Sequence, residues 1–265
     1  MVERVTIALS SLPPEFDAIT LAVVADLHAG TRYRDSTAVG EAVEITNSLQ
    51  ADIIVLLGDL VHGIGRADPC LSLLSGLKAK EGVWACLGNH EHGFVWYSRY
   101  LGPSAAPSVD EWRKLYADAG IELLANEARP LPRPRSRIWL LGVDDAYSGH
   151  DDLPAALAQV CTREFCLALT HSPDLIDDTR IGEVDLVLAA HTHGGQIRLP
   201  LVGPLFAPCR RLRERASGLV HANGTTMYVT RGAGEALPVR INCPREISLV
   251  TLVCEPEFAA RGRTQ

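Results

Sequence analysis

The chain has 265 residues, 47% of them hydrophobic, and a formal net charge of -7 at pH 7. A chain of this length and composition can bury the core of one large domain, and we expect a single domain over residues 1–265. The negative charge argues against a general nucleic-acid or membrane-surface binder, because such proteins normally carry a basic face. We therefore expect no nucleic-acid partner, and a peripheral membrane contact is left open only through a local basic patch.

The cysteines and the N-terminal residues bear on the compartment. The seven cysteines are odd in number and contain no Cys-x-x-Cys pair, which favours reduced thiols over a disulfide framework or a structural zinc site. The first residues lack the apolar region and cleavage site of a secretory signal, and no stretch approaches the roughly 18 apolar residues that a spanning helix needs. We expect a soluble, cytoplasmic protein, whose oligomeric state the sequence does not specify.

The first part of the chain alternates strand and helix patterns. Two strand-like segments, residues 5–10 and 19–25, are separated by Pro13 and Pro14, which favours a hairpin. Residues 35–50 then have helical spacing, residues 53–57 form an apolar run of strand length, residues 67–79 read as a helix, and residues 83–87 as a strand. This alternation is typical of βαβ units.

The later part begins with a loop, residues 94–108, and a helix over residues 108–119 that Ser108 can cap. A short strand at 121–125, a proline-rich turn region at 127–137 and a strand at 138–143 follow, with short helices at 151–160 and 172–179. Beyond Gln196 the chain is loop-rich and then β, with strand patterns at 219–221, 227–230 and 247–253. We predict an α/β protein in which two packed sheets carry outer helices.

Polar side chains follow five apolar strand patterns at the point where each strand ends. They are Asp26 and His28, Asp59, Asn89 and His90, His171, and His191 and His193. Sites in open α/β sheets form outside the carboxyl ends of the strands, so we expect these side chains to converge. Imidazole, carboxylate and amide oxygen together suit Mn²⁺, Fe²⁺ or Zn²⁺, and the set is large enough for two divalent ions that share a carboxylate.

These motifs, in this order, resemble those of the calcineurin-like metallophosphoesterases. The resemblance rests on Asp26-x-His28, Gly58-Asp59, Gly88-Asn-His-Glu91, His171 and His191-x-His193. The ending His191-Thr-His-Gly-Gly-Gln-Ile-Arg-Leu-Pro200, with Thr230-Arg-Gly232, Pro238-Val-Arg240 and Pro244-Arg-Glu-Ile247, is similar to the YkuE/YaeI-type bacterial phosphodiesterase branch. The resemblance covers residues 19–253 and implies a four-layer α/β/β/α sandwich of two mixed sheets flanked by helices.

The resemblance also implies roles for individual residues. Asp26, His28, Asp59 and His193 would hold a first metal ion, and Asp59, Asn89, His171 and His191 a second. Asp59 would bridge the two ions, and His90 would be the catalytic residue that faces the substrate. Two ions supply hydroxide near neutral pH and neutralise phosphate oxygens, while a protonated His90 could stabilise the transition state or protonate the leaving oxygen.

The sequence departs from the family pattern at two positions. His62 stands where many members have an acidic residue that orients the catalytic histidine, and a second histidine would disfavour the protonated form of His90. We expect His62 to influence the protonation of His90 as a neighbouring side chain, without binding a metal. Ala190 replaces the glycine usual before His-Thr-His, where its methyl group would crowd the end of the sheet.

Several other residues could contact a substrate. Arg32 and Arg34 follow the first motif and could reach a phosphate, although a solvated loop is an equal alternative. We interpret the cluster of Arg210, Arg211, Arg213 and Arg215 as a solvated face, with binding of an anionic head group as the alternative.

The sequence thus predicts a dinuclear metal-dependent phosphoesterase that hydrolyses phosphodiester or pyrophosphate bonds. One alternative is a UDP-2,3-diacylglucosamine-type lipid pyrophosphatase, which should leave an exposed apolar patch near the loop at 94–106 or at 199–208. The rival of another class is a metal-binding scaffold for a partner protein. The substrate and the metal are not fixed by the sequence.

Overall fold

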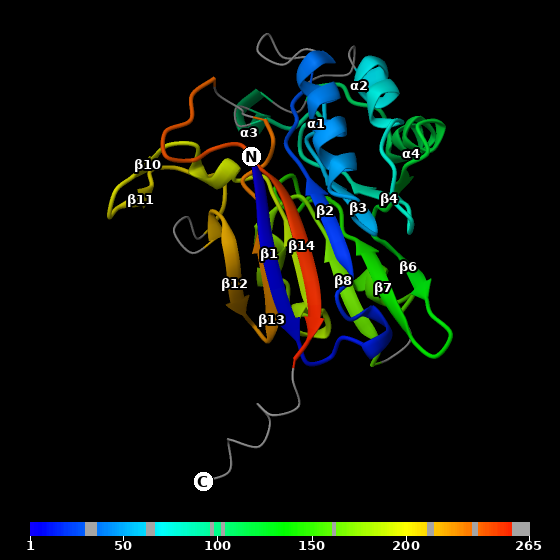
Figure 1. Ribbon diagram of the computed structural model, residues 1–265. Coiled ribbons are helices and arrows are strands. Elements are labelled where there is room, and N and C mark those ends of the chain that lie inside the picture. Colours follow the sequence, from blue (N-terminus) through cyan, green and yellow to red (C-terminus); the bar gives the residue numbers. More distant parts are fainter. Residues whose placement is uncertain are drawn as a thin grey trace.

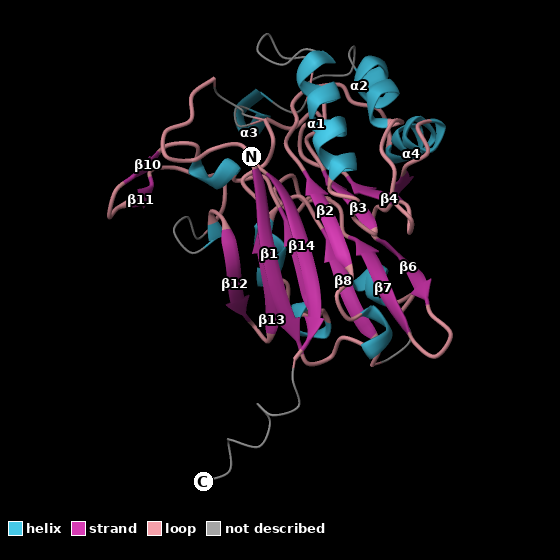
Figure 2. Cartoon of the chain, viewed as in Figure 1, coloured by secondary structure: helices cyan, strands magenta, loops and turns pink. Residues whose placement is uncertain are grey.

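The computed structural model describes residues 1–29, 36–61, 67–95, 98–101, 104–160, 163–210, 215–234 and 238–255. Two six-stranded mixed sheets form its centre (Figures 1 and 2). The first has the order β1-β14-β2-β3-β4-β5, with β1 Val2–Leu9, β14 Ile247–Cys254, β2 Thr20–Val24, β3 Ile53–Leu57, β4 Val83–Cys86 and β5 Glu122–Leu123. The second has the order β12-β13-β9-β8-β7-β6, with β12 Gly218–Ala222, β13 Thr225–Val229, β9 Leu186–Ala189, β8 Phe165–Leu169, β7 Arg137–Gly142 and β6 Glu127–Pro132.

Helices cover the outer face of each sheet. The first sheet carries α1 Ser36–Ser48, α2 Ala67–Leu74 and α4 Val109–Asp118, which Figure 2 shows grouped beside β2, β3 and β4. The second carries α5 Leu153–Leu157 and the 3-10 helices η3 Pro173–Asp177 and η4 Ile181–Glu183. The four-layer α/β/β/α arrangement is therefore confirmed.

Strand β3 shows how the sequence produces the layers. Successive side chains of a strand point to opposite faces of the sheet. Ile53, Val55 and Leu57 therefore enter the core between the two sheets, while Ile54 and Leu56 pack under the helices. Because both faces of β3 are buried, its sequence is a continuous apolar run.

The hairpin predicted from residues 5–10 and 19–25 is wrong. Strand β14 lies between β1 and β2, parallel to β1 and antiparallel to β2. Both connecting prolines belong to a longer link, in which η1 Pro14–Phe16 buries Phe16 against the inter-sheet core. β14 is buried along most of its length, so its backbone N–H and C=O groups need a strand on each side. A hairpin of β1 and β2 would leave one of those sides unpaired.

The proline-rich region at 127–137 is also more ordered than a turn. Residues Glu127–Pro132 form β6, which pairs with β7. The prolines are tolerated because β6 is at the edge of its sheet, where one side of the strand needs no partner.

Among the helices, α4 follows its prediction closely, because Ser108 caps it and forms a capping box with Glu111. α2 ends earlier than expected, at Leu74, and α3 Ser98–Leu101 occupies part of the expected loop. No helix among the described residues is long and apolar enough to cross a membrane.

Candidate metal centre

The ends of strands from both sheets meet at one place. Asp26 and His28 follow β2, Asp59 follows β3, and His171 and His193 follow β8 and β9 of the other sheet. Three overlapping groups have potential ligand atoms within 4.8 Å of one another: Asp26, His28 and His193; His28, Asp59 and His90; and Asp59, His171 and His191. The predicted convergence of distant strand ends is therefore observed.

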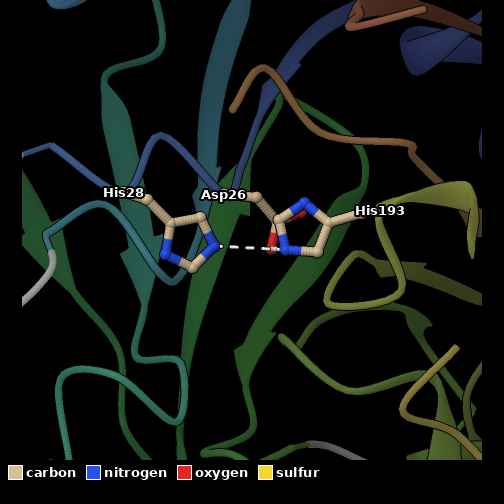
Figure 3. Close-up of side chains that lie close together, drawn as sticks. All are labelled: Asp26, His28 and His193. Atoms are coloured by element: carbon tan, nitrogen blue, oxygen red, sulfur yellow. Dashed lines mark hydrogen bonds and ion pairs between the residues drawn. The ribbon is translucent and has the colours of Figure 1, made fainter. Parts of the chain in front are cut away.

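Asp59 is central to this arrangement. Its Oδ2 lies 3.2 Å from Nε2 of His171 and 3.7 Å from Nε2 of His28. On one side, His28 Nε2 is 3.1 Å from His193 Nε2, the contact drawn in Figure 3. On the other side, His171 Nε2 is 3.0 Å from His191 Nδ1. One carboxylate thus touches two separate groups of imidazoles.

The backbone at these residues is unusual. Asp26, His28, Asp59, His191 and His193 all have positive φ, between 47° and 68°. Few residues other than glycine adopt this left-handed region, although aspartate and histidine are enriched there. A run of such residues at the ends of strands turns each side chain into the site, and strained backbone of this kind clusters at functional sites.

Glu91 holds two of the strand-end loops together. Its fully buried carboxylate accepts hydrogen bonds from the backbone N–H groups of Gly88, Asp59, Leu60 and Val61, at 2.8 to 3.2 Å. The loops after β3 and β4 are therefore fixed to one another, and with them Asp59 and Asn89.

Glycines allow the backbone to approach the carboxylates. A Cβ on Gly232 would lie 2.4 Å from Oδ2 of Asp26, and a Cβ on Gly88 would lie 2.3 Å from Oδ1 of Asp59. Because neither distance is tolerable, both positions require glycine. This gives a physical reason for the Thr230-Arg-Gly232 segment, far along the chain from the ligands.

The donor atoms fit divalent cations. Among the described residues, both carboxylate oxygens of Asp26, Oδ1 of Asn89 and Nε2 of His191 are buried without a hydrogen-bond partner. Buried polar atoms are normally satisfied, so several unsatisfied acceptors in one place indicate a site for a cation. The mixture of imidazole, carboxylate and amide oxygen suits Mn²⁺, Fe²⁺ or Zn²⁺.

Neighbouring groups orient two of these donors. Asn89 donates from Nδ2 to the carbonyl oxygen of Phe94, at 2.5 Å, which leaves its Oδ1 toward the site. His171 Nδ1 lies 2.7 Å from the carbonyl oxygen of Leu57, so that nitrogen carries a proton and donates it, and Nε2 faces the site. Such partners behind a ligand fix its tautomer and its direction.

Burial and mutual charge strongly perturb the pKa values of the clustered side chains. Burial raises the pKa of Asp26 to about 7. Burial also opposes ionisation of Asp59, but the neighbouring His171 imidazolium outweighs it and holds the pKa of Asp59 well below its usual range. Burial, with the Arg240 guanidinium, lowers the pKa of His193 to about 3. His193 is thus neutral, as a metal ligand must be.

His90 is placed differently from the other histidines. Its side chain is 12% exposed, and its Nε2 lies 3.9 Å from Asp59 Oδ2. Its ring meets that of His28 edge-on, with centroids 4.6 Å apart, and its backbone N–H donates to Asp59 Oδ1 at 2.9 Å. This partly open position beside the cluster is where a substrate-facing residue would lie.

Several residues at the site were missed in the sequence. Asp144 and Asp145 come two and three residues after the end of β7, so the same strand-end rule would have found them. Asp144 lies 2.7 Å from Nε2 of His92, whose pKa it raises against the effect of burial, and among the described residues Oδ1 of Asp145 has no partner. The ring of Tyr147 lies against that of His191, with centroids 4.5 Å apart.

Arg240 was quoted in the sequence only as part of a motif. Its guanidinium donates to the backbone carbonyls of His193, Arg231, Gly234 and Cys243. It therefore fixes the loop that carries His193, a role that no local spacing in the sequence reveals.

Some predicted contacts are not described by the structure, and one is corrected. Arg32, Arg34 and His62 lie outside the described residues, as do Arg211 and Arg213. Arg215 does not belong to a solvated face, because it is buried and pairs with Asp177 at 2.7 Å. Its guanidinium also lies 3.5 Å from the buried Asp174, so two carboxylates compensate the burial of its charge.

Comparison with known proteins agrees with this geometry. The family of calcineurin-like phosphoesterases matches residues 19–195, a range that contains every candidate ligand and His90. Phosphodiesterase YaeI of Escherichia coli is 33% identical over 232 residues, which cover 87% of this chain and 80% of that protein. The uncharacterized metallophosphoesterase YkuE of Bacillus subtilis is 29% identical over 251 residues, 93% of this chain and 83% of that protein. The chain belongs to the calcineurin-like phosphoesterase family and is a metal-dependent phosphoric ester hydrolase.

Proposed function

We propose that the chain hydrolyses phosphodiester or pyrophosphate bonds at a dinuclear metal centre, within a single catalytic domain. In this proposal Asp26, His28, Asp59 and His193 hold one ion, and Asp59, Asn89, His171 and His191 hold the other. The observation that carries it is the position of Asp59, within 3.7 Å of an imidazole from each group. A shared carboxylate is what a pair of closely spaced ions requires.

Manganese, iron(II) and zinc are the ions that this donor set favours. When bound as a pair, such ions provide a hydroxide nucleophile near neutral pH and offset the charge of the phosphate oxygens. The protein holds the ligands in place through Glu91, Gly88, Gly232 and the Arg240 guanidinium, so that little reorganisation is needed when substrate binds.

His90 is the residue that we assign to the substrate. Its backbone is held by Asp59, while its imidazole lies at the partly exposed side of the cluster. From this position His90 can donate a proton to the leaving oxygen. We also keep His62 in the proposal, as a neighbour that adjusts how readily His90 holds a proton.

The name of one relative supports hydrolysis of phosphodiesters. YaeI is named a phosphodiesterase, and we extend that activity to this chain as part of the proposal. Exposed apolar side chains at residues 199–206 favour a second candidate, a phosphodiester or pyrophosphate in a lipid head group, as in a UDP-2,3-diacylglucosamine-type substrate.

The test is hydrolysis of bis-p-nitrophenyl phosphate with Mn²⁺, before and after chelation. We expect chelation to abolish turnover and Asp59→Asn to lower kcat/KM by at least about 100-fold, because ligand losses of this kind weaken metal binding or activity strongly. Asp52→Asn is the matched control. Asp52 lies just before β3, at the opposite end of the strand from Asp59, and accepts a hydrogen bond from the backbone N–H of Thr20.

Asp52→Asn should retain full activity and metal content. Turnover that survives both chelation and Asp59→Asn would refute the proposal. Two equivalents of bound metal without turnover of any phosphate ester would instead support the metal-binding scaffold.

A further inference from the structure

The segment after the metal-binding histidines carries a concentration of exposed apolar side chains. Seven large hydrophobic residues are exposed on two short segments: Leu199, Leu201, Val202, Leu205, Phe206, Val239 and Ile241. In the rest of the described chain the exposed large hydrophobic residues are Met1, Ile45, Tyr100 and Leu219, which are scattered over separate elements. A concentration of this kind marks an interaction surface.

Backbone hydrogen bonds join the two segments into one small platform. β10 Arg198–Leu199 pairs with β11 Gly203–Pro204, which places Leu201 and Val202 at the tip of a hairpin. Ile241 lies beside Ile197, with Arg198 N–H donating to the carbonyl oxygen of Ile241 at 3.0 Å. Figure 1 shows β10 and β11 projecting from the body of the protein, beyond the edges of both sheets.

The platform is attached to the metal centre through both segments. His193 is only five residues before Arg198, a separation of at most about 18 Å. Arg240, between Val239 and Ile241, donates to the carbonyl oxygen of His193 at 3.2 Å. Whatever surface receives the apolar tip is therefore brought close to the catalytic site.

Charge separates this region from the rest of the chain. Overall the protein has a net charge of -7, yet residues 197–213 contain four arginines and no acidic residue, and residues 236–245 contain two arginines and no acidic residue. The side chain of Arg210 is 68% exposed and only loosely paired, at 3.9 Å from Asp174 and 4.0 Å from Asp177, and Arg245 is exposed as well. Basic residues beside an apolar tip are the combination that anionic membranes attract, whereas the acidic remainder of the protein is repelled.

We propose that this platform, residues 197–206 and 238–241, docks the protein on the surface of an anionic phospholipid bilayer. The apolar tip enters the head-group region, and the exposed side chains of Arg210 and Arg245 contact lipid phosphates. The projecting shape favours a bilayer over a protein groove, because β10 and β11 extend away from the body of the protein and Leu201, in the turn between them, is fully exposed. Docking itself does not require catalysis, but its consequence, access to the phosphates of lipid head groups, rests on the proposed function.

The test is co-sedimentation of the full chain with vesicles of phosphatidylcholine alone or with about one third phosphatidylglycerol. We expect the chain to sediment with the anionic vesicles, and Leu201→Ser/Phe206→Ser to lower its partition coefficient by about tenfold or more, because each apolar side chain contributes to insertion. The matched control is Ile45→Ser/Leu219→Ser, since these exposed residues lie outside the platform. It should bind as the unaltered chain does.

Hydrolysis of soluble bis-p-nitrophenyl phosphate by the same variants separates the two proposals. The platform variant, Leu201→Ser/Phe206→Ser, should keep this activity while it loses vesicle binding. If the unaltered chain binds anionic vesicles but does not hydrolyse the ester, the catalytic proposal is refuted and the docking proposal stands. Docking is refuted if the unaltered chain does not sediment with anionic vesicles, if neutral vesicles bind it equally well, or if the control variant loses binding to the same extent. A dimer that dissociates in the platform variant, without vesicle binding, would identify a second copy as the occupant and refute the membrane.

Discussion

A methyl group has no room at residue 232, because its position would fall 2.4 Å from Oδ2 of Asp26. Gly232 and Gly224 both have left-handed backbone, with φ of 71° and 83°, but nothing lies within 4 Å of a Cβ on Gly224. Gly224→Ala should therefore cost only the backbone strain, about 1 kcal/mol. Gly232→Ala should cost about 3 kcal/mol and lower metal affinity at least about tenfold, because Asp26 must move.

Urea unfolding of the two alanine variants measures the first difference, and titration of Mn²⁺ into the metal-free proteins measures the second. Equal losses of stability and equal metal affinities in the two variants would show that the contact with Asp26 is unimportant.

His90 can be separated from the ligands by its dependence on the leaving group. We expect His90→Asn to bind two equivalents of metal and to lose about 100-fold in kcat with an alkyl phosphodiester, since the alkoxide needs a proton as it leaves. With p-nitrophenolate, which leaves without protonation, the loss should be much smaller. Steady-state kinetics with both substrates measure the difference, and His221→Asn, a change at an exposed histidine on β12, is the control.

A uniform loss of activity with both leaving groups would argue against proton donation by His90. Loss of metal from His90→Asn would show that it is a ligand.

At this scale the sequence predicted which residues converge but not what holds them. Asp26, His28, Asp59 and the others could be found because ligand chemistry repeated at strand ends. Glu91 and Arg240 could not be assigned a role, since each acts on backbone groups that only the folded loops bring within reach.

Among the elements, the loops after β3 and β4 depend on one buried carboxylate. In Glu91→Gln an amide group would face backbone N–H groups that now donate to an oxygen, so at least one buried donor loses its acceptor. We expect the free energy of unfolding to fall by about 2 to 4 kcal/mol. Glu111→Gln, at an exposed capping box that glutamine also satisfies, should change stability little.

Chemical denaturation of the two glutamine variants tests this prediction. A Glu91→Gln protein as stable as Glu111→Gln would mean that the four backbone hydrogen bonds do not hold the loops together.

The elements predicted correctly are those whose pattern is local. The start of α4 is visible in Ser108 and Glu111, three residues apart, and β3 is visible as an apolar run between two turns. The pairing of β1 with β14 joins the two ends of the sequence, so the nearer partner, β2, was preferred wrongly. The prolines of β6 led to the prediction of a turn for a similar reason, because the edge position of β6 depends on the order of the whole sheet.

For the molecule as a whole, the site belongs to both sheets at once. Asp59 extends from β3 of the first sheet and His171 from β8 of the second, and their atoms are 3.2 Å apart. The layered fold was predictable because five motifs occurred in order. The sequence named residues 199–208 as one of two loops for an apolar patch but did not include residues 238–241 of the platform, since exposed and buried hydrophobic residues look alike in a sequence.

The central claim is that residues from the two sheets enclose a pair of ions around Asp59. Anomalous diffraction from crystals of the Mn²⁺-loaded protein tests it most directly. We predict two peaks about 3.5 to 4 Å apart, on either side of the Asp59 carboxylate, with His28 and His193 at one peak and His171 and His191 at the other. A single peak, or peaks remote from Asp59, would contradict the account.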